Sequence, residues 1–200
     1  MKPRDLVFHG LAIKRHASCA AIADSTGLSM EAVGEVLASA EAAGRVASVR
    51  DGYTLTPLAR VALEARYGLI YTDVREDPAF VAAYERFEAI NIVLKQVITD
   101  WQTVNIRGER VVNDHADEAY DTRLITRLGA THERAEPILE AMAVRLPRLA
   151  IYHHKLTEAV ERAEDGEIDW VSDVRRESYH TVWFELHEEL LRIMGTVRSE

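Results

Sequence analysis

The feature that most constrains this chain is a series of helix-start and helix-stop residues in its first third. Ser18 and Ser29 can each accept a hydrogen bond from the first turn of a helix. Gly27 and Gly44 are typical of helix ends, because glycine readily adopts the left-handed conformation found there. Helices bounded in this way are short, so the sequence predicts a small helical domain.

Hydrophobic spacing places helices and two short strands between these boundaries. The Thr56-Pro57 pair starts a further helix, because proline at the first helical position lacks only an N–H that has no helical partner there. The expected order is a helix at 4–14, a helix at 18–27, a helix at 29–44, strands at 45–49 and 53–55 joined by a tight turn at 50–52, and a helix that begins at Pro57.

Two short patterns in this region resemble winged helix-turn-helix regulators of the MarR-like type. They are A-x-x-x-G-L-S-x-x-x-V-x-x-x-L, at residues 23–37, and L-T-P-x-A-R, at residues 55–60. The resemblance covers residues 1–67. It implies a winged helix-turn-helix domain in a mainly α protein, with the third helix placed to enter the major groove of double-stranded DNA.

The expected third helix is acidic where a DNA-reading helix usually carries Arg, Lys, Asn or Gln. Its outward positions include Glu31, Glu35 and Glu41, and carboxylates close to phosphates oppose binding. Two interpretations remain open. Either the domain binds DNA through its wing and flanks, or the fold serves as a protein-docking or dimerisation module. The candidate DNA-contacting residues are Lys14, Arg15, Ser29, Arg45 and Arg50.

Charge divides the chain unevenly. Residues 1–67 carry 8 Lys/Arg and 7 Asp/Glu, whereas the following 133 residues carry 16 and 26. Any contact with nucleic acid is therefore expected in the first part. Because the apolar runs are short and the first residues lack a clean apolar block, we expect a cytoplasmic chain without membrane contact. Cys19, the single cysteine, cannot form an internal disulfide.

Residues 68–76 are expected to be a linker with an extended segment near 69–71, and residues 77–200 an all-helical bundle for dimerisation, effector binding or both. Asp77-Pro78 starts a long helix that reaches Trp101. A second helix is expected from Asn113. Pro137 and Pro147 divide the following pattern into separate helices. A last helix spans 178–194, after a loop at 167–174.

The last helix carries the densest chemistry. His180, Trp183, Phe184 and His187 are expected on its inward face, with Glu185, Glu188 and Glu189 outward. One interpretation is a core helix with hydrogen-bonded histidines. Another is an effector pocket, whose candidate residues are Trp101, Tyr120, Tyr152, His180, Trp183 and His187. A metal site is disfavoured, because residues seven apart on a helix are separated by ~10 Å.

Catalytic signatures do not stand out. The sequence offers no nucleophile elbow, phosphate-binding glycine loop or pairable Ser/His/Asp set, so neither an enzyme nor a cofactor is expected. The acidic stretch at 113–121 is read as helix capping with a solvated face. The expected function is a transcriptional-regulator-like protein, a homodimer that binds double-stranded DNA and a small-molecule effector. The alternative is an interaction or regulatory module without DNA affinity, with a protein partner such as a cytoplasmic enzyme.

Overall fold

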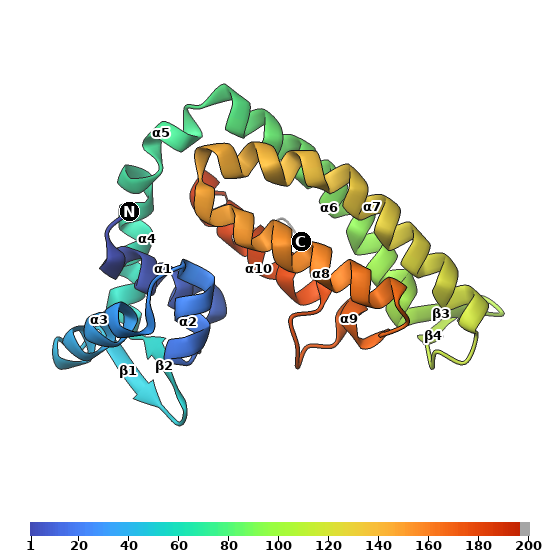
Figure 1. Ribbon diagram of the computed structural model, residues 1–200, viewed down its shortest axis with the longest axis horizontal. Coiled ribbons are helices and arrows are strands. Elements are labelled where there is room, and N and C mark those ends of the chain that lie inside the picture. The colour runs from blue at the N-terminus through green and yellow to red at the C-terminus, as the bar shows by residue number, and fades with distance from the viewer. Residues whose placement is uncertain (197–200) are drawn as a thin grey trace. The chain divides into compact units, whose positions relative to one another are not determined.

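Helices dominate residues 1–196, the part of the chain that the computed structural model describes (Figure 1). The chain forms two compact units. Unit 1 comprises residues 1–76 together with the chain from His187 onward, and unit 2 comprises Asp77–Leu186. Unit 2 is therefore inserted into the sequence of unit 1. Unit 2 begins at residue 77, as expected, but the expected linker at 68–76 and the chain from His187 onward belong to unit 1.

Unit 1 begins with three helices and a two-stranded antiparallel hairpin. Its elements are α1 (Pro3–Lys14), α2 (Cys19–Thr26), α3 (Met30–Ala42), β1 (Val46–Val49), β2 (Gly52–Leu55), α4 (Pro57–Ile70) and α5 (Thr72–Arg75). Ser18, Ser29 and Thr56 each accept a hydrogen bond from the backbone N–H three residues later, at 3.2, 3.2 and 3.4 Å. The helix starts predicted from these residues are confirmed.

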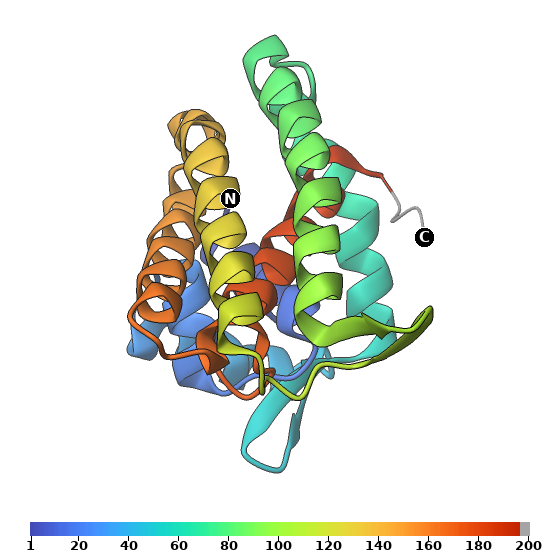
Figure 2. The ribbon, with the colours of Figure 1, turned by 90° about the vertical axis from the view of Figure 1, so that its right-hand side faces the viewer.

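The β1–β2 hairpin extends away from the helices of unit 1 (Figures 1 and 2). Val46 pairs with Leu55 and Val49 with Gly52, so the turn contains only residues 50 and 51. The expectation that Gly52 lies in the turn is wrong. Gly52 pairs with Val49 in the strand, and segment 16–17 packs closely against it: a Cβ at this position would lie 2.7 Å from the His16 imidazole.

The expected extended segment at 69–71 is also wrong, because α4 continues to Ile70 and α5 follows at once. Tyr67 and Tyr71 explain the helical conformation. Their rings stack at 5.7 Å, both side chains are buried, and the Tyr71 N–H donates to the Tyr67 carbonyl at 3.0 Å. Side chains four residues apart lie on the same face of a helix, so the helical conformation lets both rings be buried together.

Unit 2 consists of long helices and a second hairpin. Its elements are α6 (Pro78–Gln102), β3 (Thr103–Ile106), β4 (Glu109–Val112), α7 (Glu118–Arg145), the 3-10 helix η1 (Pro147–Leu149), α8 (Ala150–Glu164), α9 (Asp169–Ser172) and the first half of α10 (Tyr179–Met194). Helix α7 packs against both α6 and α8. The prediction of an all-helical bundle is wrong, because β3 and β4 form an antiparallel hairpin between α6 and α7.

Three boundary predictions in unit 2 are also wrong. Helix α7 begins at Glu118, with Asp117 as its cap, five residues after the expected start. It continues through Pro137 without a break. Pro137 and Glu133 are both exposed, so the carbonyl of Glu133, four residues earlier, can bond to water when proline offers no N–H. The expected loop at 167–174 contains helix α9.

The core of unit 2 is rich in aromatic side chains. The Trp183 ring stacks on Phe87 at 4.6 Å and on Tyr179 at 6.0 Å, and its Nε1–H donates to the Asn91 side-chain oxygen at 3.0 Å. Trp183 is therefore a satisfied core residue that joins α10 to α6. No described helix combines the length and the apolar content needed to cross a membrane.

Candidate functional site

Two exposed arginines of unit 1 hold backbone conformations that residues with side chains rarely adopt. Arg15 ends α1 with φ 64° and ψ −46°, and the His16 N–H donates to the Lys14 carbonyl at 2.7 Å, which is a γ-turn with positive φ. Arg50 has φ 54° in the β1–β2 turn. Such conformations cost on the order of 1 kcal/mol or more each, and Arg107 in the β3–β4 turn of unit 2 has one as well, so Arg15 and Arg50 are candidates because they occur together in unit 1 and not through strain alone.

Contacts between the end of α1 and the β1–β2 hairpin join the two arginines through one small sheet. The Thr54 hydroxyl donates to the Arg15 carbonyl at 2.9 Å, and His16 Nε2 lies 3.0 Å from the Val49 carbonyl oxygen. Ala17 forms an isolated bridge with Tyr53. The segment that ends α1, including the half-buried Lys14, is thereby held along the hairpin. The structure brings Lys14, Arg15 and Arg50 into one region of unit 1.

Helix α3 keeps its acidic surface. Glu31 and Glu35 are exposed, and the Ser29 hydroxyl is engaged as the helix cap. Glu41 accepts a hydrogen bond from the Ser48 N–H at 3.2 Å, so its carboxylate supports the hairpin at the end of α3. Sequence reasoning gave all three carboxylates the same role. The structure separates Glu41 from the other two.

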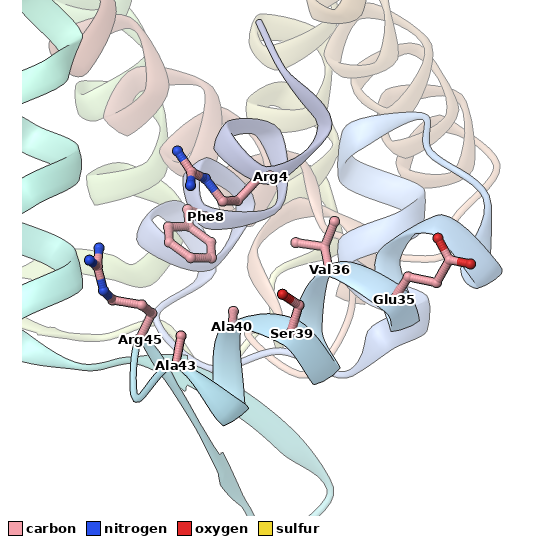
Figure 3. Close-up of a pocket in the computed structure, with 8 residues that line it drawn as sticks. All are labelled: Arg4, Phe8, Glu35, Val36, Ser39, Ala40, Ala43 and Arg45. Atoms are coloured by element: carbon pink, nitrogen blue, oxygen red, sulfur yellow. The ribbon is translucent and has the colours of Figure 1, made fainter.

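Arg45 lies at a small groove between α1 and α3 (Figure 3). The volume of the groove is about 320 Å³. Its lining residues are Arg4, Phe8, Glu35, Val36, Ser39, Ala40, Ala43 and Arg45. The sequence predicts Arg45 as a cation beside the wing but does not single out Arg4, because only the packing of α1 on α3 brings the two arginines to one groove.

The six candidate effector-pocket residues do not share one surrounding. Trp101 is buried against His115, with ring centroids 4.6 Å apart, and the Tyr120 hydroxyl donates to the Asp100 carbonyl at 3.0 Å. Trp183 stacks on Phe87, which lies about 21 Å from Trp101 along α6 at the helical rise.

The other three candidates lie on α8 and α10. Tyr152 is buried on α8, His180 is half-buried on α10, and His187 belongs to unit 1. The two clefts described for this chain, the groove at Arg45 and one in unit 2, are lined by other residues.

The inward face predicted for α10 is wrong in two places. Phe184, which was expected to point inward, is exposed. Glu189, which was expected to point outward, has an exposed fraction of 3%. Glu189 Oε1 lies 3.3 Å from His9 Nε2, an ion-pair distance at which the N–H direction does not satisfy a hydrogen bond. The other ring nitrogen of His9 lies 2.8 Å from the Tyr67 hydroxyl, and burial raises the pKa of that hydroxyl. This polar cluster joins α1, α4 and α10 within unit 1.

A second buried histidine lies in unit 2. His132 Nε2 is 3.2 Å from the Thr157 hydroxyl oxygen, and Nδ1 is 3.3 Å from the Tyr179 hydroxyl. Thr157 donates its own proton to the His153 carbonyl, so it accepts from His132, and the Tyr179 hydroxyl donates to Nδ1. Burial lowers the pKa of His132, and the nearby Glu136 carboxylate partly opposes this effect. The arrangement fits a neutral imidazole.

The acidic stretch at 113–121 contributes to a cleft of about 800 Å³ along α7 and the end of α8. His115 Nδ1 lies 2.8 Å from Asp121 Oδ2, and the Asn113 side chain donates to the same carboxylate at 3.1 Å. These contacts hold His115 at φ 58° before the start of α7. The expected capping is confirmed by Asp117, but the expected solvated face is wrong at Asp121, which is 6% exposed because it packs against Asn113 and His115.

Among residues 1–196, no three His, Cys, Asp or Glu side chains lie close enough together to hold a metal ion. Comparison of the chain with protein-family models, with curated proteins and with solved structures found no match. The function must therefore be argued from the surfaces of the two units.

Proposed function

We propose that unit 1 is a winged helix-turn-helix module that binds double-stranded DNA mainly through its wing and the end of α1. The observation that carries the proposal is the pair of strained, exposed arginines, Arg15 and Arg50, held on one small sheet. Arginine donates up to five hydrogen bonds and suits phosphate oxygens.

Helix α3 has a secondary place in this proposal. The exposed Glu31 and Glu35 disfavour close approach to phosphates, although a carboxylate can accept a hydrogen bond from a cytosine amino group. Binding that depends on two arginines at the phosphate backbone is expected to be weakly sequence-specific, with a slope of log K against log[KCl] of about −2. A protein of this kind would act on transcription through how tightly it holds DNA.

Titration of a labelled duplex from the region upstream of the protein's own gene, at several KCl concentrations, tests the proposal. Wild-type affinity should fall with salt. Arg15→Gln and Arg50→Gln should each weaken binding and reduce the slope of log K against log[KCl] by about 1, and the double variant by about 2. Absence of salt-dependent binding by the wild type would contradict the proposal.

Arg107→Gln is the matched control. Arg107 is also exposed, has φ 55° and lies in the turn of the other hairpin, β3–β4. Its replacement removes the same charge from the same backbone conformation and should leave DNA affinity unchanged. Arg50→Gly tests whether DNA binding needs the side chain itself. Relief of backbone strain offsets the entropy cost of glycine, roughly 0.5–1 kcal/mol, so the free energy of unfolding should be unchanged while DNA binding weakens.

A different observation favours a second function, protein association with a second copy of the chain. Leu58, Val61 and Leu69 on α4 are 70%, 64% and 84% exposed. Together with Ala65, which is also exposed, they follow one side of the helix at spacings of three and four residues. Exposed apolar rows of this kind mark interaction sites.

A two-fold axis through the row brings Leu58, Val61, Ala65 and Leu69 of one chain against the same residues of its partner. An apolar surface of this kind is complementary to itself, which supports a second copy as the occupant.

Sedimentation over a range of concentrations tests this association. The wild type should form dimers, whereas Val61→Glu and Leu69→Glu should remain monomeric, because each places a carboxylate at an apolar contact. Val144→Glu is the control, since Val144 is 85% exposed on α7 and outside the row. A monomeric wild type, or equal loss of dimer in the Val144 variant, would count against α4 as the contact surface.

A further inference from the structure

The cleft of unit 2 lies along α7 and the end of α8, two helices that pack side by side (Figures 1 and 2). Its volume of about 800 Å³ is in the range of small-ligand sites. Ile125 and Ile168 contribute apolar surface to the lining. None of the described residues that line the cleft is lysine or arginine, whereas four are acidic: Glu118, Asp121, Glu133 and Glu164. The cleft therefore suits a ligand that combines positive charge with an aliphatic chain.

Three of these carboxylates have no protein partner. Within residues 1–196, no hydrogen bond or ion pair engages the side chains of Glu118, Glu133 and Glu164. Asp121 differs, because its two oxygens contact His115 and Asn113. It contributes mainly negative charge, whereas the other three can also accept charge-assisted hydrogen bonds from an ammonium group.

The hydroxyl and imidazole groups of the lining are acceptors as well. Thr122 and Thr126 donate their protons to the backbone carbonyls four residues earlier, at 2.8 and 2.9 Å, so each oxygen keeps a lone pair. An ionised carboxylate only accepts, so His115 Nδ1 carries the proton that joins it to Asp121 at 2.8 Å. Nε2 of the neutral ring is then an acceptor. A ligand rich in hydrogen-bond donors matches this lining.

Gly129 gives the Glu164 carboxylate its place in the cleft. A Cβ at residue 129 would collide with Glu164 Oε1, so the carboxylate lies directly over the glycine backbone. Gly129 is in the interior of α7, where glycine is less favourable than alanine. Helix α7 thus has a helix-weakening residue at a point where any side chain would push this carboxylate away. An unpaired carboxylate held in this position is preorganised for a cation.

The carboxylates form two pairs along α7. Glu118 and Asp121 lie at the start of the helix, and Glu133 and Glu164 lie around residue 129. Residues 121 and 129 are separated by ~12 Å at the helical rise. Ile125 lies between the two levels. A linear molecule with positive charge at each end and methylene groups between them fits this pattern.

We propose that this cleft is a binding site for a linear aliphatic polyamine, whose end ammonium groups bind the two pairs of carboxylates and whose chain crosses Ile125. Each ammonium donates up to three hydrogen bonds, and the methylene carbons cover apolar surface. A bare metal ion fits less well, because no three His, Cys, Asp or Glu side chains among residues 1–196 lie close enough together to hold one. The site is independent of the DNA binding proposed for unit 1.

Backbone amide NMR of the full chain with spermidine, in the absence of DNA, tests the site. Spermidine should shift amide signals of residues 118–133 and 163–168. Triacetylspermidine, which has the same chain without the charges, should not. Magnesium chloride at matched ionic strength should not reproduce the shifts. Equal shifts with magnesium, or spermidine shifts confined to other parts of the chain, would overturn the proposal.

Variants that remove one charge sharpen the test. Glu133→Gln and Glu164→Gln should each weaken spermidine binding roughly two- to fivefold, the range expected for exposed charge pairs, and the double variant roughly tenfold. Glu140→Gln is the control, because Glu140 is an exposed carboxylate of α7 outside the cleft. It should bind spermidine like the wild type. Equal weakening by Glu140→Gln would show attraction to the overall negative charge and would overturn the site.

Gly129→Ala tests the shape of the cleft without changing the charge. The added methyl displaces the Glu164 carboxylate, so spermidine affinity should fall about as much as in Glu164→Gln. Urea unfolding checks the fold, and the midpoint should not fall below that of the wild type, because alanine favours the helix. Unchanged affinity in both Gly129→Ala and Glu164→Gln would overturn the assignment.

Discussion

At the scale of single residues, His132 shows how burial fixes the state of a titratable group. Its two ring nitrogens contact Thr157 and Tyr179, and the hydroxyl of Thr157 is already committed as a donor to the His153 carbonyl. Protonation of the ring would direct a second N–H at the hydroxyl hydrogen of Tyr179, whose side chain has an exposed fraction of 0%. Burial lowers the pKa of His132, and it lowers that of His180 on α10 as well.

The lowered pKa values of His132 and His180 predict that unit 2 loses stability in mild acid. The folded-state pKa of each histidine lies below the unfolded value of about 6.5, so the unfolded chain takes up the proton first as pH falls. The stabilising contribution is fully present above that value and is lost between about pH 6.5 and the lowered pKa. The slope cannot exceed about 1.4 kcal/mol per pH unit for each histidine.

Urea unfolding at pH 7.5 and pH 5.5 measures this effect. The wild-type midpoint should be lower at pH 5.5, and His132→Gln should reduce the difference, because glutamine does not titrate. His154→Gln is the control, since that side chain is exposed on α8. An equal pH difference in the wild type and in His132→Gln would show that His132 does not carry the effect.

At the scale of elements, local signals were predictable and distant partners were not. Ser18, Ser29 and Thr56 act within three residues of themselves, so the helix starts could be predicted from the sequence alone. Pro137 could not be placed, because its cost depends on whether the unpaired Glu133 carbonyl meets water or core. Glu189 was assigned to the outward face because its partner, His9, lies at the other end of the sequence.

The candidate site follows the same division. Charge alone singled out Arg15, Arg45 and Arg50, and all three are exposed in unit 1. Their strained backbone, the sheet that joins Arg15 to the hairpin and the groove shared by Arg45 and Arg4 arise from tertiary packing. The effector pocket was assembled from aromatic and histidine content. Several of those side chains satisfy the core instead, as Trp183 does with Asn91.

At the scale of the whole molecule, unit 1 depends on the far end of the chain. The second half of α10 belongs to unit 1, where Leu190 and Ile193 are each 0% exposed. Arg75 donates to the carbonyls of Ile193 and Arg192 at 2.5 and 3.2 Å, and Gly195 has φ 72° close to that guanidinium. Loss of α10 would remove Leu190 and Ile193 from the core of unit 1. It would also leave the buried His9 without the Glu189 carboxylate.

A fragment of residues 1–76 is therefore expected to unfold at lower urea concentration than unit 1 does within the full chain. A linked variant, with residue 76 joined to residue 187 through a flexible Gly/Ser linker, should recover much of the lost stability, because it restores the helix that carries Glu189. Circular dichroism during urea unfolding compares the two. Equal stability of the fragment and the linked variant would show that α10 contributes little.

Insertion of unit 2 also sets an order of events on the ribosome. All of Asp77–Leu186 is synthesised as one continuous stretch, so that unit can fold while translation continues. Synthesis of unit 1 begins first and is completed last, since His9 lies in its first helix and its partner Glu189 is synthesised after the whole of unit 2. A nascent chain that stops before α10 would thus expose an incompletely folded unit 1 to chaperones and proteases. Only chains that include α10 would have the activities proposed for unit 1.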